Sequence, residues 1–208
     1  MTYVKICGIT NLEDALLSDS AGADALGFNF YRQSPRFIEP FTAAAIIEQL
    51  SEKVVKVGVF VNESIEGILD TASACRIDAI QLHGNEGPEF VSELRGRTKA
   101  MIIKAVRIAS ASDLLQFNGL NSDAVLVDVY DPHMYGGTGK IADWDAAAEL
   151  RQLVERLYLA GGLGPDNVAD AIRKVRPYAV DAASGLESEK GKKDPDKVVA
   201  FITNARNA

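Results

Sequence analysis

The chain has 208 residues, of which 47% are hydrophobic and 25% are charged, a composition typical of a globular protein. Its 22 basic and 29 acidic residues give a formal net charge of −7, with no block of lysines or arginines. Because this charge repels nucleic acid and anionic membrane surfaces, we expect neither as a partner. A small anionic molecule is still compatible with the chain, since local hydrogen-bond donors can bind it.

The N-terminal residues do not form a charged segment followed by an apolar one, and no apolar run approaches the roughly 18 residues of a membrane span. We therefore expect a soluble, cytoplasmic protein. Its two cysteines, Cys7 and Cys75, make neither a disulfide framework nor a metal-ligand cluster. Since Cys7 ends a strand and Cys75 ends a helix, they should lie at opposite ends of the fold and remain free.

Apolar, β-branched runs alternate with amphipathic stretches along the whole chain. The predicted strands are 3–7, 24–29, 54–61, 78–82, 101–106, 123–128, 157–160 and 179–183. The predicted helices are 11–20, 41–51, 64–75, 87–95, 110–118, 144–153, 166–175 and 194–205. Strict alternation indicates parallel strands with helical crossovers, and eight such strands close into a barrel. We predict one α/β domain, a (βα)8 TIM barrel, over residues 1–208.

A doubly wound open sheet is the structural alternative. It would place phosphate-binding glycines in Gly-x-Gly-x-x-Gly spacing after the first strand, and "CGITNLED" lacks that spacing. Thr10 to Glu13 instead has the Ser/Thr-x-x-Glu spacing of a capping box, which predicts a helix starting after Thr10.

Two reactive side chains end predicted strands and so face the mouth of the barrel, where active sites of this fold lie. Cys7 ends "YVKIC" and Asp128 ends "DAVLVD". In ring order, the seventh and eighth strands lie between them, so the thiol and the carboxyl flank whatever those strands bind. A small buried hydrophobe at Cys7 and a loop cap at Asp128 are the alternatives. Asp24, Asp78 and Asp123 begin strands, at the opposite end, and we assign them to stability.

Glycines gather in three loops at the same mouth. "GGTGK", "AGGLGPDN" and "ASGLE" contain Gly137, Gly139, Gly162, Ser184 and Gly185. Backbone N–H groups in such loops bind phosphate without a net positive charge. Ordinary turns are the alternative, but adjacent clusters after the last two strands of a barrel favour phosphate.

Three further charged features lie near the predicted mouth. Arg36, in "YRQSPRF", suits bidentate capture of a carboxylate, with a solvated loop charge as the alternative. His83 is either a strand-end cap or a donor to the substrate. The charged run 187–197 is predicted to be a solvated loop, in which Lys192 or Lys193 is able to face the phosphate.

The motifs "KICGIT", "GFNFYRQSPR", "VGVFVN", "IQLHG", "VDVYDPHMYGGTGK", "AGGLGPDNV" and "VDAASGLESEKGKKD" occur in that order. Together they resemble phosphoribosylanthranilate isomerase of tryptophan biosynthesis, from about residue 3 to residue 205. The resemblance implies a single-domain barrel without a cofactor. Either a monomer or a homodimer is compatible with the sequence. The resemblance also implies an Amadori rearrangement of N-(5-phosphoribosyl)anthranilate to 1-(2-carboxyphenylamino)-1-deoxyribulose 5-phosphate.

By the same resemblance, Cys7 is the general base, Asp128 the general acid and Arg36 the partner of the anthranilate carboxylate. The phosphate is expected on backbone donors around the three glycine loops. Two positions depart from the family pattern, where relatives often have a hydroxyl residue: Val129 after the acid and Ala183 before Ser184.

Other functions on this barrel fit the sequence less well. A metal-dependent sugar epimerase needs converging His and Asp ligands, and the chain has only His83 and His133. The related two-substrate isomerase of histidine biosynthesis pairs two aspartates, and Cys7 stands where the first would be. A non-catalytic phosphosugar-binding barrel would have no reason to keep both Cys7 and Asp128.

Overall fold

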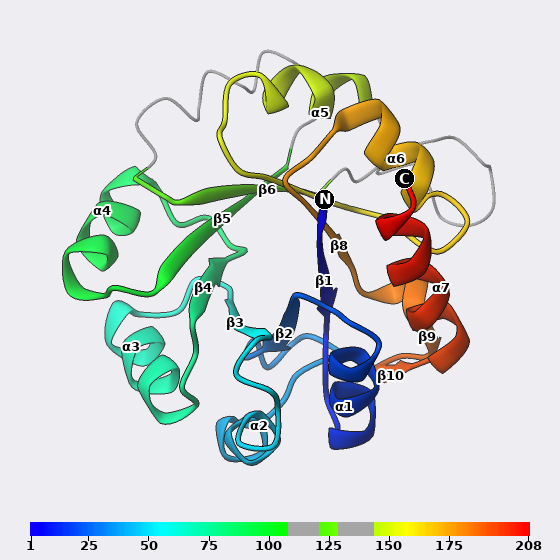
Figure 1. The fold of residues 1–208 in the computed structure, drawn as a ribbon. Coiled ribbons are helices and arrows are strands. Elements are labelled where there is room, and N and C mark those ends of the chain that lie inside the picture. The colour runs from blue at the N-terminus through cyan, green and yellow to red at the C-terminus, as the bar shows by residue number, and fades with distance from the viewer. Residues whose placement is uncertain (108–120, 129–143) are drawn as a thin grey trace.

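The computed structural model describes residues 1–107, 121–128 and 144–208 of the 208-residue chain. Eight parallel strands form a closed barrel in the order β1 to β8, which confirms the predicted (βα)8 fold (Figure 1). The strands are β1 Tyr3–Cys7, β2 Ala25–Asn29, β3 Val55–Phe60, β4 Ala79–Leu82, β5 Met101–Arg107, β6 Ala124–Asp128, β7 Leu157–Ala160 and β8 Ala179–Ala182. Their bounds agree with the predicted strands to within a residue.

Helices surround the barrel on its outer side (Figure 1). They are α1 Leu12–Ser20, α2 Pro40–Ile47, α3 Ile65–Ala74, α4 Pro88–Arg97, α5 Trp144–Arg151, α6 Val168–Val175 and α7 Pro195–Arg206. The helix predicted over 110–118 lies outside the described residues. Within the described ranges, no helix is long and apolar enough to cross a membrane.

The start of α1 differs from its prediction by one residue. Asn11, not Thr10, is the N-cap, and its side chain accepts a hydrogen bond from the Asp14 N–H at 2.8 Å. The Thr10 hydroxyl donates instead to the carbonyl of Gly191, in the loop after β8. The predicted capping box is therefore wrong, because its threonine is used by a contact distant in sequence.

Aspartates immediately before β2, β4 and β6 bind the backbone of the preceding strand. Asp24 accepts from the N–H of Val4 at 2.7 Å and Asp78 from that of Lys56 at 2.9 Å. Asp123 accepts from the N–H of Ile102 at 2.7 Å. These contacts agree with the structural role predicted for the three aspartates.

The period of two along each strand separates two packing layers. Outward residues such as Val4, Ile6 and Ile80 join the large core between barrel and helices. The inner layer consists largely of small residues, among them Ala25, Ala79, Ala105, Ala124 and Ala179. The inner layer also holds a charged pair, because Lys5 Nζ lies 2.8 Å from Asp181 Oδ2 and both side chains are buried.

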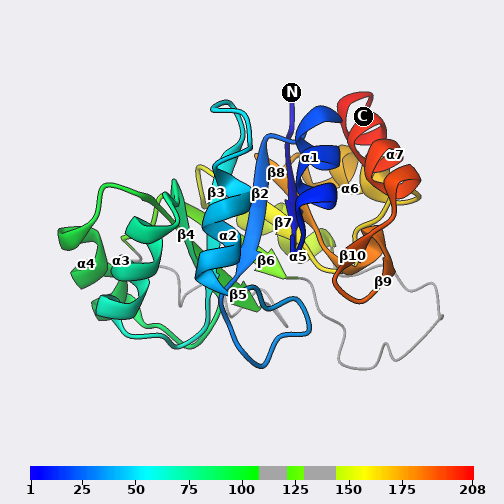
Figure 2. The ribbon, with the colours of Figure 1, turned by 90° about the horizontal axis from the view of Figure 1, so that it is seen from below.

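The charged run after β8 is folded, contrary to the prediction of a solvated loop. A short 3₁₀ helix, η2 Ser184–Leu186, leads into an antiparallel hairpin of β9 Glu187–Glu189 and β10 Lys192–Lys193. Figure 2 shows this hairpin beside α7, on the outer side of β8. Glu187 and Lys193 are buried because they bind each other and the end of the barrel, with their Oε1 and Nζ atoms 3.4 Å apart.

Candidate active site

Cys7 and Asp128 end β1 and β6, as predicted, and His83 directly follows β4. Along each strand, alternate residues face the barrel interior: Lys5 precedes Cys7, Gln81 precedes His83, and Leu126 of the inner core precedes Asp128. The same period therefore directs all three side chains to the mouth. Each is partly exposed there, so solvent and a ligand have access.

The Cys7 thiol has an electrostatic environment with opposing parts. Burial raises its pKa above the ordinary cysteine value; the Lys5 ammonium opposes this shift and the Asp181 carboxylate adds to it. Lys193 lowers the pKa as well, but burial outweighs both lysines. The net shift of the Cys7 pKa is upward, because burial disfavours the charged thiolate more than the two lysines favour it.

His83 connects Asp128 to the interior of the barrel. Its Nε2 lies 3.6 Å from Asp128 Oδ2, and its Nδ1 lies 2.9 Å from the Gln81 side-chain amide nitrogen. Gln81 is buried, and its Oε1 has no hydrogen-bond partner within the described residues. When the Gln81 amide donates to Nδ1, the neutral imidazole carries its proton on Nε2, toward the carboxylate.

A buried ion pair fixes the loop that carries His83. Lys104 Nζ lies 2.7 Å from both Glu86 Oε2 and the carbonyl oxygen of Gly84. Glu86 accepts from the backbone N–H groups of Gly84 and Asn62, in the loops after β4 and β3. Burial alone would raise the pKa of Glu86, but these hydrogen bonds outweigh it and lower the pKa. Glu86 is therefore ionised at neutral pH and ties the two loops together.

Arg36 lies in the loop after β2, beside β1, and it is bound by Glu187. Arg36 Nε lies 2.6 Å from Glu187 Oε1, and Nη2 lies 2.7 Å from Oε2. This fork-to-fork geometry is the strong form of an arginine–carboxylate contact. Sequence reasoning missed Glu187, which lies 151 residues further along the chain.

Lys193 joins this pair to the end of β1. Its Nζ donates to the carbonyl oxygens of Cys7 at 2.7 Å and Ala183 at 3.1 Å. The backbone N–H of Lys193 donates to the side chain of Asp14, at the start of α1, at 2.8 Å. The sequence left open whether Lys192 or Lys193 faces the phosphate. Lys192 is exposed, and the Lys193 ammonium is used by the protein itself.

The loops after β7 and β8 lie against each other, as the phosphate prediction requires. A Cβ on Gly185 would come 2.1 Å from the carbonyl oxygen of Leu163, so only glycine permits this contact. Gly162 and Ser184 are exposed at the surface of the two loops. Among the described residues, no hydrogen bond uses the N–H of Gly162. Gly137 and Gly139 lie outside the described residues.

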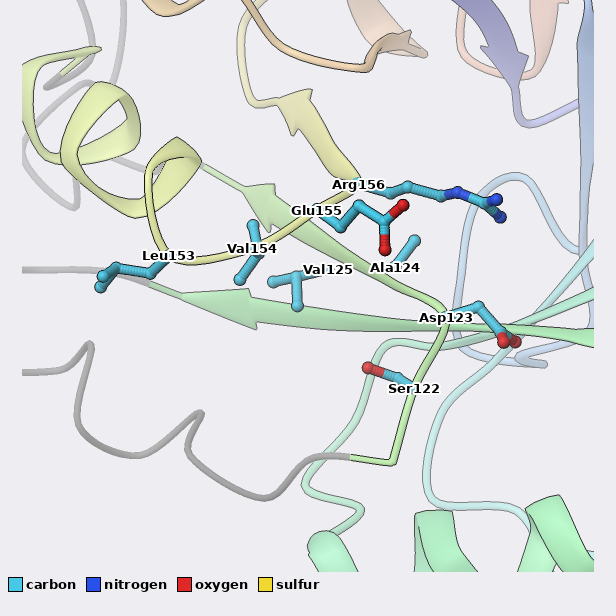
Figure 3. Close-up of a pocket in the computed structure, with 8 residues that line it drawn as sticks. All are labelled: Ser122, Asp123, Ala124, Val125, Leu153, Val154, Glu155 and Arg156. Carbon is cyan, nitrogen blue, oxygen red and sulfur yellow. The ribbon is translucent and has the colours of Figure 1, made fainter.

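A pocket of about 430 Å³ lies at the other end of the barrel (Figure 3). Its lining comes from the segments that begin β6 and β7: Ser122, Asp123, Ala124, Val125, Leu153, Val154, Glu155 and Arg156. Its lining residues lie at the starts of β6 and β7, whereas Cys7 and Asp128 are the last residues of β1 and β6. We do not assign it to the active site.

A closed barrel with a thiol, a carboxyl and glycine loops at the carboxyl ends of its strands defines the class of (βα)8-barrel enzymes. Comparison with known proteins narrows that class. The family model described as N-(5'phosphoribosyl)anthranilate (PRA) isomerase matches residues 4–204. The N-(5'-phosphoribosyl)anthranilate isomerase of Trichlorobacter lovleyi is 50% identical over 208 residues, 100% of both chains. The chain belongs to the phosphoribosylanthranilate isomerase family, as the sequence motifs predicted, and is an isomerase of tryptophan biosynthesis.

Solved structures agree with this family. The crystal structure of phosphoribosyl anthranilate isomerase from Thermotoga maritima has a TM-score of 0.90 and 45% identity, with 100% of both chains covered. Another phosphoribosyl anthranilate isomerase was solved in complex with reduced 1-(o-carboxyphenylamino)-1-deoxyribulose 5-phosphate. It has a TM-score of 0.87 and 43% identity, again over 100% of both chains.

Proposed function

We propose that this chain converts N-(5-phosphoribosyl)anthranilate to 1-(2-carboxyphenylamino)-1-deoxyribulose 5-phosphate, with Asp128 as general acid and Cys7 as general base. The observation that carries the proposal is the placement of these two side chains. They end β6 and β1, on either side of the adjacent glycine loops that follow β7 and β8. A phosphate bound by those loops holds the sugar between the carboxyl and the thiol.

The chemistry needs both groups. Asp128 gives a proton to the furanose oxygen as the bond from that oxygen to C1 breaks, and the nitrogen lone pair forms an imine. The imine acidifies the hydrogen on C2, which the Cys7 thiolate removes, and the electron pair forms an enolamine. The enolamine then becomes the ketone as C1 gains a proton and the hydroxyl on C2 loses one. The net change moves one hydrogen from C2 to C1 and one from the C2 hydroxyl to the former ring oxygen, with no external oxidant or reductant.

The remaining residues of the proposal bind rather than react. Arg36 pairs with the anthranilate carboxylate, and the phosphate accepts hydrogen bonds from the backbone at Gly137, Gly139, Gly162, Ser184 and Gly185. His83 contacts either the substrate or Asp128, and its distance to Asp128 favours the second role. We propose that the enzyme works in the cytoplasm on this small-molecule phosphosugar, with neither nucleic acid nor a membrane as a partner.

The proposal is tested by adding the protein to enzymatically generated phosphoribosylanthranilate and following the loss of anthranilate-type fluorescence. Cys7→Ser and Asp128→Asn should each lose at least about 10²-fold in kcat/KM, because general acid–base terms are typically 10²–10⁴. Both variants should keep near-native affinity for the reduced product analogue. Near-wild-type kcat/KM in a folded variant would remove that residue from its role.

The proposal leaves two oligomeric states, monomer and homodimer. One solved relative consists of mutually generated monomers of the dimeric phosphoribosylanthranilate isomerase from Thermotoga maritima. Light scattering on the purified protein at assay concentration decides between the two states for this chain.

A further inference from the structure

Arg36 uses only one edge of its guanidinium in its contact with Glu187. Nε and one N–H of Nη2 bind the two carboxylate oxygens. A guanidinium has five N–H donors in one plane, so three remain, on Nη1 and the outer side of Nη2. That second edge has the geometry to bind another carboxylate bidentately. Within the described residues, no hydrogen bond uses Nη1.

Glu187 is itself held from both sides. Its side chain is 6% exposed, and Lys193 Nζ lies 3.4 Å from Oε1. Burial alone would raise the pKa of Glu187, but Arg36 and Lys193 outweigh it and lower the pKa. Burial lowers the pKa of Lys193, whereas the contact with Glu187 raises the pKa of Arg36. Arg36 therefore keeps its positive charge, and its free edge suits an anionic group on a protein whose net charge is −7.

The cluster also fixes Arg36 relative to the thiol. Lys193 binds the Cys7 carbonyl oxygen at 2.7 Å, so a chain of direct contacts runs from Cys7 through Lys193 and Glu187 to Arg36. Gly8 permits the approach, because a Cβ at residue 8 would come 2.5 Å from Arg36 Cδ. The position of the free guanidinium edge is thus determined by β1 and by the hairpin after β8, rather than by the loop of Arg36 alone.

We infer that Glu187 is a positioning residue that orients Arg36 toward the aryl carboxylate and so sets the preference for a 2-carboxyarylamine substrate. This inference rests on the proposed function, in which Arg36 binds that carboxylate. Glu187 does not touch the substrate. It binds one edge of the Arg36 guanidinium and leaves the other edge facing the substrate carboxylate. Because Arg36 is already ordered before binding, little side-chain entropy is lost when the substrate binds.

The test compares two ligands by calorimetry. One is reduced 1-(o-carboxyphenylamino)-1-deoxyribulose 5-phosphate, and the other is the same molecule without the carboxylate. Glu187→Gln is nearly isosteric but turns an amide toward Arg36 Nη2. It should weaken binding of the carboxylate ligand about 10-fold or more, the scale of a charged hydrogen bond, and change the second ligand by less than about twofold.

The matched control is Glu189→Gln, an exposed glutamate on the same hairpin, which should change neither affinity. Glu187→Asp keeps the charge on a shorter side chain and should fall between wild type and Glu187→Gln, so the test stands even if the glutamine variant does not fold. Equal weakening of both ligands, or of neither, would overturn the positioning role.

A double-mutant cycle separates this inference from the proposed function. Arg36→Met should lose selectivity between the two ligands, and adding Glu187→Gln should then cost nothing more. Preserved selectivity in Arg36→Met would refute the carboxylate role of Arg36. Lost selectivity in Arg36→Met, with full selectivity in Glu187→Gln, would leave the proposed function intact and overturn the inference alone.

Discussion

His83 Nε2 lies 3.6 Å from Asp128 Oδ2, across the mouth of the barrel from β4 to β6. The imidazole is held from behind by Gln81, whose side-chain nitrogen is 2.9 Å from Nδ1. An imidazole in this position can orient the Asp128 carboxyl and interact with its changing charge during the reaction. His83 can therefore act through Asp128 as well as through a direct contact with the substrate.

We expect His83→Asn to lower kcat about 10-fold while KM changes by less than about threefold, since an interaction specific to the transition state affects kcat. Steady-state kinetics with the fluorescent substrate measures both constants. Asn85→Ala, at an exposed position in the same loop, is the control and should behave like wild type. A raised KM with unchanged kcat would instead identify His83 as a simple substrate-binding residue.

The pH dependence of kcat/KM should be bell-shaped, with an alkaline limb that belongs to Cys7. The working form needs a thiolate beside a protonated carboxyl, although a carboxylic acid is intrinsically a stronger acid than a thiol, which ordinarily ionises near pH ~8.5. Burial raises the pKa of Cys7 further. The working form is therefore a minor species whose population rises with pH, levels off, and falls once pH exceeds the thiol pKa.

Cys7→Ser should lose this alkaline limb together with at least about 10²-fold of kcat/KM. Cys75→Ser is the matched control, because Cys75 is buried at the end of α3 and its Sγ lies 3.3 Å from the Pro40 carbonyl oxygen. It should keep both limbs and the wild-type rate. Retention of an unchanged alkaline limb in Cys7→Ser would contradict the assignment.

Two glycines of the β7 and β8 loops should respond differently to alanine. Gly185→Ala places a Cβ 2.1 Å from the Leu163 carbonyl oxygen, so the loops must separate. At Gly164 the nearest atom would be 3.6 Å away, an ordinary contact. We expect Gly185→Ala to weaken competitive inhibition by millimolar sulfate or phosphate about 10-fold, and Gly164→Ala to leave it unchanged. Equal inhibition constants in both variants would show that these loops do not hold the phosphate.

The substitution Lys5→Met should destabilise the fold strongly, because it removes the ammonium that pairs with the buried Asp181 carboxylate. The expected loss is about 3–5 kcal/mol in the free energy of unfolding, measured by urea denaturation. The double variant Lys5→Met with Asp181→Leu should be more stable than Lys5→Met alone. If Lys5→Met lost less free energy of unfolding than the double variant, the destabilisation would not come from an unpaired Asp181 carboxylate.

The pH dependence of that loss follows from the pKa of Lys5. Burial alone would lower it, but Asp181 outweighs burial and raises it above the ordinary lysine value. A raised folded-state pKa contributes stability that is complete below the unfolded value, about 10.4, and is lost as pH rises through the folded one. The difference between wild type and Lys5→Met should therefore be constant near neutrality and shrink only above about pH 10.4.

The strands and the positions of Cys7 and Asp128 at the barrel mouth could be predicted from the sequence because both follow from local periodicity. β-branched runs mark each strand, and the last inward residue of a strand must face the mouth, which places Cys7 and Asp128. Roles of residues 110–118, Gly137 and Gly139 stay predictions, since they lie outside the described part of the chain.

Glu187 and Lys193 could not be found in this way. A charged run such as 187–197 is ordinarily solvated, and burial of two of its members depends on partners distant in sequence: Arg36, and the carbonyl oxygen of Cys7. Single-sequence patterns contain no signal for such pairings. The residues directly after Glu187 in the sequence are themselves polar, so the local pattern does not distinguish a buried glutamate from an exposed one.

The aspartates before β2, β4 and β6 have a consequence for how the barrel is assembled. Each one fastens its own strand to the preceding strand over about 20 residues of chain, which gives three two-strand modules, β1–β2, β3–β4 and β5–β6, each held by one side-chain contact. At the seam, Arg206 of α7 binds Asp24 and the carbonyl oxygen of Thr2, which brings the two chain ends together. A circular permutant that joins these ends and opens in the exposed segment 51–53, between the first two modules, keeps every module intact and should fold to the same barrel.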